Sequence, residues 1–317
     1  MIISRSPMRI SLFGGSTDYK SFYEKHGSFI IGATINKYAY SIIRYRPPIV
    51  GCESMITYSK LEKTKDLNEI TNPLIRETLK YYKIQNPIEL NLATDIPSRT
   101  GLGGSSSCCA SLANAVCNLM KLPHNAHTTC ADAIKIEREI LNEPGGIQDQ
   151  IWACRGGFNT IAIDPDGTYY INPLPVSNKF LKIFKDSLVM VYSKKQREFS
   201  NGSHPDEEKN KLKILDIAGQ AYNTFKEEDI KGIGQLLYES WLQKRSTSAN
   251  ISDDSIDGLI DDIMNVGAYG AKLLGNGGGG FVLAICNNRV KKQLKELYKE
   301  DVLDFRISKG GIKTTIL

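Results

Sequence analysis

The sequence predicts an α+β fold built from two domains, on three observations. The chain has 317 residues, more than one compact core usually organises, so two domains sharing one interface are expected. Segments with strand patterns are mixed with segments of helical spacing, in an order that favours antiparallel returns. The character of the sequence also changes around 173–185, which separates a domain at 1–178 from one at 179–317.

The N-terminal part is expected to consist mainly of strands. β-Branched and aromatic side chains fill 28–35 and 37–45, and such residues favour strands. A proline near the start of 73–82 favours a short helix there. The predicted elements are strands at 1–11, 28–35, 37–45 and 88–93, and a helix at 73–82.

The stretch around which the chain is organised is 97–107, PSRTGLGGSSS. Its glycines and serines open directly into a helix, since apolar side chains recur at helical spacing from Cys109 to Met120. A helix N-terminus has unpaired N–H groups and a partial positive charge, which suit a phosphate group. An ordinary glycine turn with a serine N-cap is the alternative interpretation.

An acidic residue lies on the inward face of the next predicted helix, 128–141. This face is formed by Cys130, Ala133, Ile134, Ile140 and Leu141. Glu137 falls in the middle of it, whereas Glu139 points outward. A carboxylate on a buried face needs a cation or a hydrogen-bond donor. Either a salt bridge to Arg99 or Arg138, or a metal ion, satisfies this requirement.

A further polar site is predicted within 145–157, GGIQDQIWACRGG. Glycine pairs bracket Asp149, which stands between Gln148 and Gln150, so the segment lacks the pattern of a solvated face. A plain N-cap aspartate is the alternative.

The rest of the chain mixes helices and strands around a second glycine loop, GNGGGG at 275–280. Helical spacing of apolar residues predicts the helices, and β-branched runs and turn residues predict the strands. The predicted elements are strands at 158–163, 168–171, 188–192 and 281–286, helices at 211–224, 230–245, 254–274 and 289–299, and a final strand pair at 302–307 and 312–317.

Composition and charge exclude several functional classes. The net charge of +5 fits an anionic ligand such as a nucleotide but is not gathered into a basic arm, which argues against nucleic acid. The 7 cysteines are an odd number without metal spacing, which indicates free thiols in a reducing compartment. Arginines interrupt the N-terminus where a signal peptide is apolar, and no apolar run reaches the ~18 residues of a membrane span. We expect a cytoplasmic protein without a membrane span; whether it forms a homodimer stays open.

Three segments, in order, resemble the motifs of the GHMP family, the small-molecule kinases named for galactokinase, homoserine kinase, mevalonate kinase and phosphomevalonate kinase. They are SPMRISLFGGSTDY at 6–19, PSRTGLGGSSS at 97–107 and KLLGNGGGGF at 272–281. Motifs of P-loop enzymes, protein kinases and dinucleotide-binding proteins are missing. The resemblance runs over nearly the whole chain and implies a ribosomal-protein-like N-terminal half and a ferredoxin-like C-terminal half.

The resemblance also implies ATP and Mg²⁺ as cofactors. The residues that would hold the ATP phosphates are Pro97, Gly101, Leu102, Gly103, Gly104, Ser105, Ser106 and Ser107. Ser105 and Glu137 would hold Mg²⁺. Because Gly104 stands where the first of two serines is usual in the family, the assignment of the metal-binding serine can shift by one residue.

Catalytic and substrate roles follow from the same resemblance. Asp149 matches the family's catalytic aspartate and would orient the acceptor hydroxyl, with its action as a base left open. Arg9 matches a basic residue that would pair with Asp149 and offset charge on the phosphoryl group. The predicted substrate-binding residues are Asp18, which would hold sugar hydroxyls, and Gly14, Gly15, Gly277 and Gly278.

Within the family, the segments at 136–141, 145–159 and 241–245 are most similar to the D-glycero-D-manno-heptose 7-phosphate kinases. This implies phosphorylation of the anomeric hydroxyl to a 1,7-bisphosphate, for nucleotide-heptose synthesis. Arg197, helped by Lys194 or Lys195, would hold the 7-phosphate, unless this is a solvated charge run. The sequence GGSTDY at 14–19, in place of G-E-H-T-D-Y, counts against galactose. A kinase of another sugar such as fucose, and a non-catalytic nucleotide or sugar sensor, stay open as alternatives.

Overall fold

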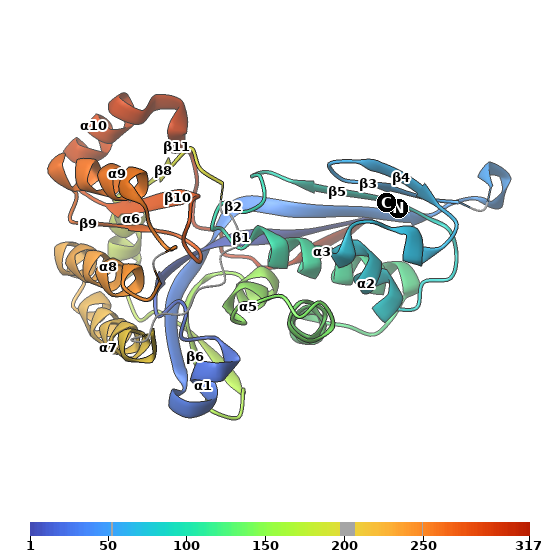
Figure 1. The fold of residues 1–317 in the computed structure, drawn as a ribbon, viewed down its shortest axis with the longest axis horizontal. Helices are drawn as coiled ribbons and strands as arrows, with labels where there is room; N and C mark the ends of the chain where they lie inside the picture. Colours follow the sequence, from blue (N-terminus) through green and yellow to red (C-terminus); the bar gives the residue numbers. More distant parts are fainter. Residues whose placement is uncertain (52, 197–206, 249) are drawn as a thin grey trace.

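The computed structural model describes residues 1–51, 53–196, 207–248 and 250–317. They form a sheet of eight strands and a sheet of four, with helices packed around both (Figure 1). The predicted α+β class is confirmed. The domain boundary expected after residue 178 coincides with the start of helix α6 (Asn178–Asp186) and stays a prediction.

The eight-stranded sheet is built around two long, curved strands, β1 and β2. Its strands are β1 (Ile2–Phe13), β2 (Ser28–Tyr45), β3 (Ser54–Thr57), β4 (Leu61–Thr64), β5 (Ile88–Thr94), β6 (Phe158–Ile163), β7 (Tyr169–Pro173) and β12 (Lys313–Ile316). The main path is β12-β1-β2-β5-β3-β4, and β6 joins the other half of β2 and carries β7. All of these pairs are antiparallel except β3 with β5.

The strands predicted at 28–35 and 37–45 are one strand, β2. The register against β1 shifts where Pro7 pairs with Tyr38 and Arg9 pairs with Thr34, so residues 35–37 bulge from the ladder. Proline has no N–H to donate to a ladder, which suits a break in pairing at this point. The bulge interrupts the alternation of the sequence without turning the chain, and that is why the prediction divided the strand.

The helices of the N-terminal half include one, α3, that is almost completely enclosed. They are α1 (Lys20–His26), α2 (Pro73–Tyr81), α3 (Gly104–Met120), α4 (Ala126–Ile134) and α5 (Gln148–Arg155), with short helical turns at Pro48–Val50 and Leu67–Glu69. Helix α3 packs against β1, β2, α4 and α5, and every residue from Ser106 to Cys117 is buried. Its small Ser, Cys and Ala side chains allow this close packing.

Helix α4 continues into a π-helical turn, Lys135–Ile140, that carries Glu137. Glu137 is buried, as predicted. Ile140, predicted on the inward face, is 41% exposed instead, because the wider π turn rotates the last residues away from the 3.6-residue spacing.

The four-stranded sheet has the order β11-β8-β10-β9 and is antiparallel throughout. Its strands are β8 (Leu188–Tyr192), β9 (Gly270–Leu273), β10 (Phe281–Ile285) and β11 (Val302–Leu303), and the helices beside it are α6, α7 (Glu207–Lys226), α8 (Ile230–Arg245), α9 (Asp254–Asn265) and α10 (Asn288–Tyr298), followed by a short turn at Lys299–Asp301.

Two predictions for this half are wrong. The helix expected over 254–274 ends at Asn265, because the chain turns at Gly267 with a φ of 110° and then forms β9 against β10. The strand pair expected at the C-terminus does not form: β11 pairs with β8, whereas β12 returns to β1 in the other sheet. The C-terminal strand therefore completes the N-terminal sheet.

One hydrophobic core joins the two halves. It includes Ile10 and Leu12 of β1 together with Met190 of β8 and Leu283 of β10. The opposite face of the smaller sheet packs on α9 and α10 through a separate cluster.

Among the described residues, no helix is long and apolar enough to cross a membrane.

Candidate active site

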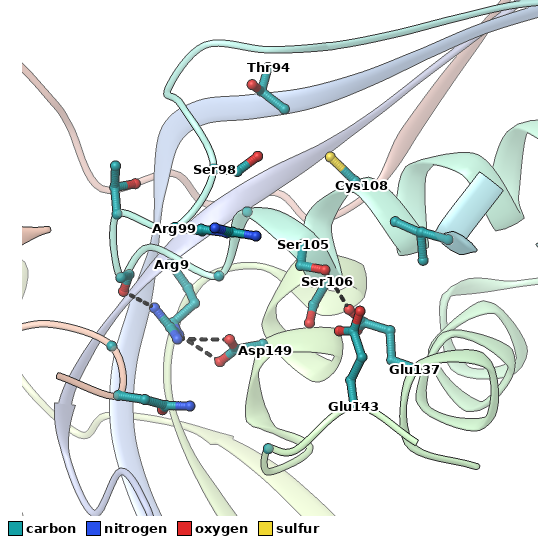
Figure 2. Close-up of a pocket in the computed structure, with 18 of the residues that line it drawn as sticks. Arg9, Thr94, Ser98, Arg99, Ser105, Ser106, Cys108, Glu137, Glu143 and Asp149 are labelled. Carbon is teal, nitrogen blue, oxygen red and sulfur yellow. Dashed lines mark hydrogen bonds and ion pairs between the residues drawn. The ribbon is translucent and has the colours of Figure 1, made fainter. Parts of the chain in front are cut away.

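Arg9 of β1 and Asp149 of α5 form a bidentate ion pair (Figure 2). The Nε–Oδ1 distance is 2.7 Å and the Nη2–Oδ2 distance is 2.8 Å. The third guanidinium nitrogen, Nη1, donates to the Gly101 carbonyl at 2.6 Å, and the Arg9 backbone N–H donates to Leu102. Arg9 thus fixes both Asp149 and the glycine loop at 97–107.

That glycine loop ends at the N-terminus of α3 without a side-chain cap. Gly103 is the N-cap residue, with a φ of 71° in the left-handed region. A Cβ there would lie 3.3 Å from Asp149 Oδ2 and 3.2 Å from Arg9 Cγ, so a glycine keeps the loop close to the ion pair. The first N–H groups of α3 have no acceptor within the helix, which suits them to bind an anion.

The second glycine loop packs against the first. A Cβ on Gly101 would lie 2.4 Å from the Leu274 carbonyl oxygen, and one on Gly280 would lie 2.3 Å from that of Thr100. Phe281 also donates its backbone N–H to Thr100. The two loops, distant in sequence, therefore meet backbone to backbone beside Arg9.

Glu137 lies next to the start of α3, entirely shielded from solvent. Ser105 Oγ donates to its Oε1 at 2.9 Å, and Gln150 Nε2 donates to its Oε2 at 2.6 Å (Figure 2 shows the serine contact). Burial raises the pKa of Glu137 above its ordinary value, an effect that the Arg138 charge opposes. Arg138 acts from a distance here, since its guanidinium donates to the Glu143 and Gly146 carbonyls.

Asp18 is also buried and is held by the start of α5. The Gln148 backbone N–H donates to Asp18 Oδ2 at 3.0 Å, and Gln148 Nε2 donates to Oδ1 at 2.8 Å. A Cβ on Gly146 would lie only 1.8 Å from Asp18 Oδ2, so any larger residue here would displace the Asp18 carboxylate. Burial raises the pKa of Asp18, and the nearby Asp149 charge adds to the effect.

These groups line one cavity of about 670 Å³. Its lining includes Arg9, Asp149, Ser105 and Glu137, together with Asp18 and Asn276. The cavity lining also contains an aromatic and apolar group, Tyr58, Pro73, Leu74 and Leu92. The cavity therefore joins an anion-binding helix start, a fixed carboxylate and an apolar region, and its volume is in the range of small-molecule sites.

Comparison with known proteins finds two matching domain families. The GHMP kinases N-terminal domain matches residues 69–157, and the GHMP kinases C-terminal domain matches residues 222–301. The chain belongs to the GHMP kinase family. It is therefore a phosphotransferase.

Similar proteins span the whole GHMP kinase chain. D-glycero-alpha-D-manno-heptose 7-phosphate kinase of Campylobacter jejuni is 29% identical over 99% of this chain and 98% of its own length. A galactokinase of Pyrococcus furiosus is 21% identical over 95% and 94%. The crystal structure of a D-glycero-D-manno-heptose 1-phosphate kinase from Bacteroides thetaiotaomicron has the same fold, with a TM-score of 0.83, 21% identity and coverage of 100% and 99%.

Some of the predicted site residues of this GHMP kinase lie away from the main cavity. Leu102 is buried in the core, and Ser107 Oγ donates to the Pro7 and Gly103 carbonyls. Gly277 and Gly278 pack against Ile251. Gly14 lies against the Phe29 backbone, and Gly15 lines a smaller cavity behind Arg9. Arg197 lies outside the described residues, so its role stays a prediction.

Sequence reasoning missed several residues of the site. Glu143 lines the cavity and, in Figure 2, its side chain lies beside Glu137. Lys244 of α8 and Lys272 of β9 lie in the smaller cavity with Arg9. A lysine in the middle of the apolar run at 268–274 was the available signal for Lys272, since a cation on a buried strand needs a partner.

Proposed function

We propose that this GHMP kinase transfers the γ-phosphoryl group of ATP to the anomeric hydroxyl of a heptose 7-phosphate. The observation that carries the proposal is the Arg9–Asp149 pair beside the uncapped start of α3. A carboxylate held by two hydrogen bonds can orient an acceptor hydroxyl, while the helix start and Arg9 supply positive charge for a phosphoryl group. Positioning and charge stabilisation are what phosphoryl transfer requires of a protein.

Asp149 is the residue for the acceptor. Both of its oxygens accept from Arg9, which fixes the plane of the carboxylate and leaves further lone pairs to accept from a hydroxyl. An anomeric hydroxyl is more acidic than an ordinary alcohol, so a carboxylate in this position suffices to take its proton as the bond to phosphorus forms.

ATP fits the part of the main cavity that the acceptor does not occupy. The backbone N–H groups at 103–106 would receive the β- and γ-phosphates, and Tyr58, Pro73 and Leu92 offer apolar surface to the nucleobase.

Ser105 at the start of α3 and Glu137 in the adjacent π-helical turn fit Mg²⁺. Glu137 is a buried carboxylate that contacts hydroxyl and amide groups, and within the described chain it forms no ion pair. The oxygens of Glu137 and Ser105 are the ligands that Mg²⁺ prefers, and few protein ligands are usual because the ion keeps waters and phosphate oxygens. Among the described residues, no group of three His, Cys, Asp or Glu side chains could hold a metal ion by itself. The ion would therefore depend on waters and phosphate oxygens for its remaining ligands. When bound, Mg²⁺ would offset the charge on the phosphate oxygens.

The comparison of two relatives favours a heptose 7-phosphate as the acceptor. The Campylobacter protein named as a heptose 7-phosphate kinase aligns with 99% of this chain, and the galactokinase has lower identity. Other sugars, such as fucose or galactose, are the alternative acceptors, and a sensor without turnover is the alternative of a different class.

An assay over a panel of sugars tests the proposal. ADP release is measured with heptose 7-phosphate, unphosphorylated heptose, fucose, galactose and mevalonate at equal concentrations, and phosphorus NMR locates the new phosphate. We expect the highest kcat/KM for heptose 7-phosphate, with the product phosphorylated at the anomeric carbon. A higher kcat/KM for another acceptor, or no turnover of any, would refute the assignment.

A further inference from the structure

A second, smaller cavity lies behind Arg9, between β1 and the C-terminal half. Arg9, Gln148, Gly275 and Asn276 line both this cavity and the main one, so the two adjoin. Its other polar lining residues are Ser11, Ser16, Ser240, Lys244 and Lys272. We call it the Lys244–Lys272 pocket. Its described lining contains three cations and no carboxylate.

Lys272 is the most unusual group in this pocket. It is 4% exposed, and its Nζ donates to the Leu12 carbonyl at 2.7 Å. Within the described chain it has no salt bridge, and the charges that act on it are those of Lys244 and Arg9. Burial, reinforced by these charges, holds the pKa of Lys272 well below its ordinary value. A buried ammonium beside other cations is stabilised by an anion.

Two neutral groups in the same pocket are buried without a partner. The Ser11 hydroxyl and the Gln148 side-chain oxygen make no hydrogen bond, although both residues are only 7% exposed. Gln148 Nε2 is engaged by Asp18, so its oxygen is the end left to accept from a ligand. Buried polar groups are nearly always hydrogen-bonded. The Ser11 hydroxyl and the Gln148 oxygen therefore indicate that a polar ligand binds in this pocket.

We propose that the Lys244–Lys272 pocket, in place of the segment around Arg197 that the sequence suggested, is the subsite for the phosphate group that the sugar substrate already carries. Lys244, Lys272 and the Ser11 hydroxyl supply donors to phosphate oxygens, and the Gln148 oxygen accepts from a neighbouring sugar hydroxyl. This inference rests on the proposed sugar phosphate kinase activity and deepens it.

The size of the pocket fits one oxygen of a phosphate that approaches from the main cavity. Its volume is about 20 Å³, which holds one oxygen-sized group. A phosphate would place one oxygen there between the lysines, with its remaining oxygens and the sugar on the side of Gln148 and Asp18. The opposite end of the sugar would then lie toward Asp149, in the main cavity.

The first test compares two acceptors that differ only in the phosphate. The selectivity is the kcat/KM for heptose 7-phosphate divided by that for unphosphorylated heptose. We expect Lys244→Met and Lys272→Met each to lower this selectivity about 30-fold, as for the loss of a hydrogen bond to a charged group. Lys291→Met is the matched control, since Lys291 also donates to backbone carbonyls but lies on α10; its selectivity should equal that of the wild type.

A structural role for the lysines would instead lower both kcat/KM values together and leave the selectivity unchanged, which would overturn the proposal. Ser11→Ala covers the case in which a lysine variant does not fold. Removing an unpaired buried hydroxyl does not lower stability, yet the subsite assignment requires Ser11→Ala to reduce the selectivity about fivefold.

The second test needs no turnover and so separates this proposal from the proposed function. Inorganic phosphate is titrated into the enzyme saturated with a non-hydrolysable ATP analogue and Mg²⁺, so that the nucleotide phosphate site is filled, and binding is measured by calorimetry. We expect a site in the wild type and in Lys291→Met whose Kd rises at least tenfold in Lys244→Met. Equal binding in all three proteins, or no binding to the wild type, would overturn the subsite whether or not the enzyme phosphorylates a heptose.

Discussion

The guanidinium of Arg9 donates two hydrogen bonds, of 2.7 and 2.8 Å, to the carboxylate of Asp149, which lies 140 residues further along the chain. The pair links β1 to α5, and its third donor links both to the glycine loop. The side chain of Arg9 is 6% exposed and that of Asp149 is 21% exposed. The arginine is thus a rigid support, and the aspartate is the member of the pair that reaches into the cavity.

Asp149→Asn is expected to reduce kcat at least about a hundredfold, because an amide cannot take a proton and offers Arg9 one acceptor in place of two. The measurement is ADP release at saturating ATP and acceptor. Calorimetric binding of the ATP analogue serves as the control and should change little. Turnover within tenfold of the wild type would show that Asp149 does not do this work.

The sequence was sufficient for the parts of the site that are local in the chain. The uncapped start of α3 follows from the glycines at 101–104 and the apolar spacing behind them, and Glu137 stands out because its neighbours at helical spacing are apolar. The Arg9–Asp149 pairing came from family resemblance, since no local pattern joins residues 140 positions apart.

The parts that sequence reasoning missed depend on long-range pairing. Lys272 was placed on a helix, and its role became visible only because β9 pairs with β10 and places its ammonium against Leu12 of β1. The return of β12 to β1 likewise depends on the ladder from Ile2 with Ile316 to Arg5 with Lys313. Strand partners are chosen by packing and register across the sheet, which a short window of sequence does not contain.

Ser105 and Ser107 should respond differently to removal of their hydroxyls. Ser105 Oγ contacts Glu137, whereas Ser107 Oγ donates to the Pro7 and Gly103 carbonyls inside the protein. We expect Ser105→Ala to raise the Mg²⁺ concentration for half-maximal activity about tenfold. Ser107→Ala should leave that concentration unchanged and lower the free energy of unfolding by about 1 kcal/mol. The reverse pattern would exclude Ser105 as the metal-binding serine.

Glu137→Gln tests the burial of this carboxyl through the pH dependence of stability. The folded-state pKa of Glu137 is raised above its ordinary value of 4.5, so between these two values the folded protein binds more protons than the unfolded chain, and stability falls as pH rises. Without metal, the Tm of the wild type should therefore fall relative to that of Glu137→Gln as pH rises above 4.5. Below that pH the difference in Tm should be constant.

Added Mg²⁺ provides the control for Glu137→Gln. A cation beside the ionised carboxylate offsets its burial, so Mg²⁺ with the ATP analogue at pH 8 should raise the Tm of the wild type more than that of the variant. A pH-independent difference between the two metal-free proteins would contradict the raised pKa, and an equal Mg²⁺ effect would contradict Glu137 as a metal ligand.

Gly101→Ala should disrupt the contact between the two glycine loops. Gly101 has a φ of 83°, and a Cβ would lie 2.4 Å from the Leu274 carbonyl oxygen, so both backbone conformation and space oppose alanine. We expect an increase in the KM for ATP of at least about tenfold and a loss of about 2 kcal/mol in the free energy of unfolding, since the loop also carries the acceptor for Arg9 Nη1.

Gly219→Ala in α7 is the matched control, because no atom lies within 4 Å of its added Cβ and its backbone is helical. That variant should gain about 0.5–1 kcal/mol in stability, with the KM for ATP unchanged. Chemical denaturation and steady-state kinetics on the two variants decide the point: if Gly101→Ala behaves like Gly219→Ala, the close approach of the two loops is not required for nucleotide binding.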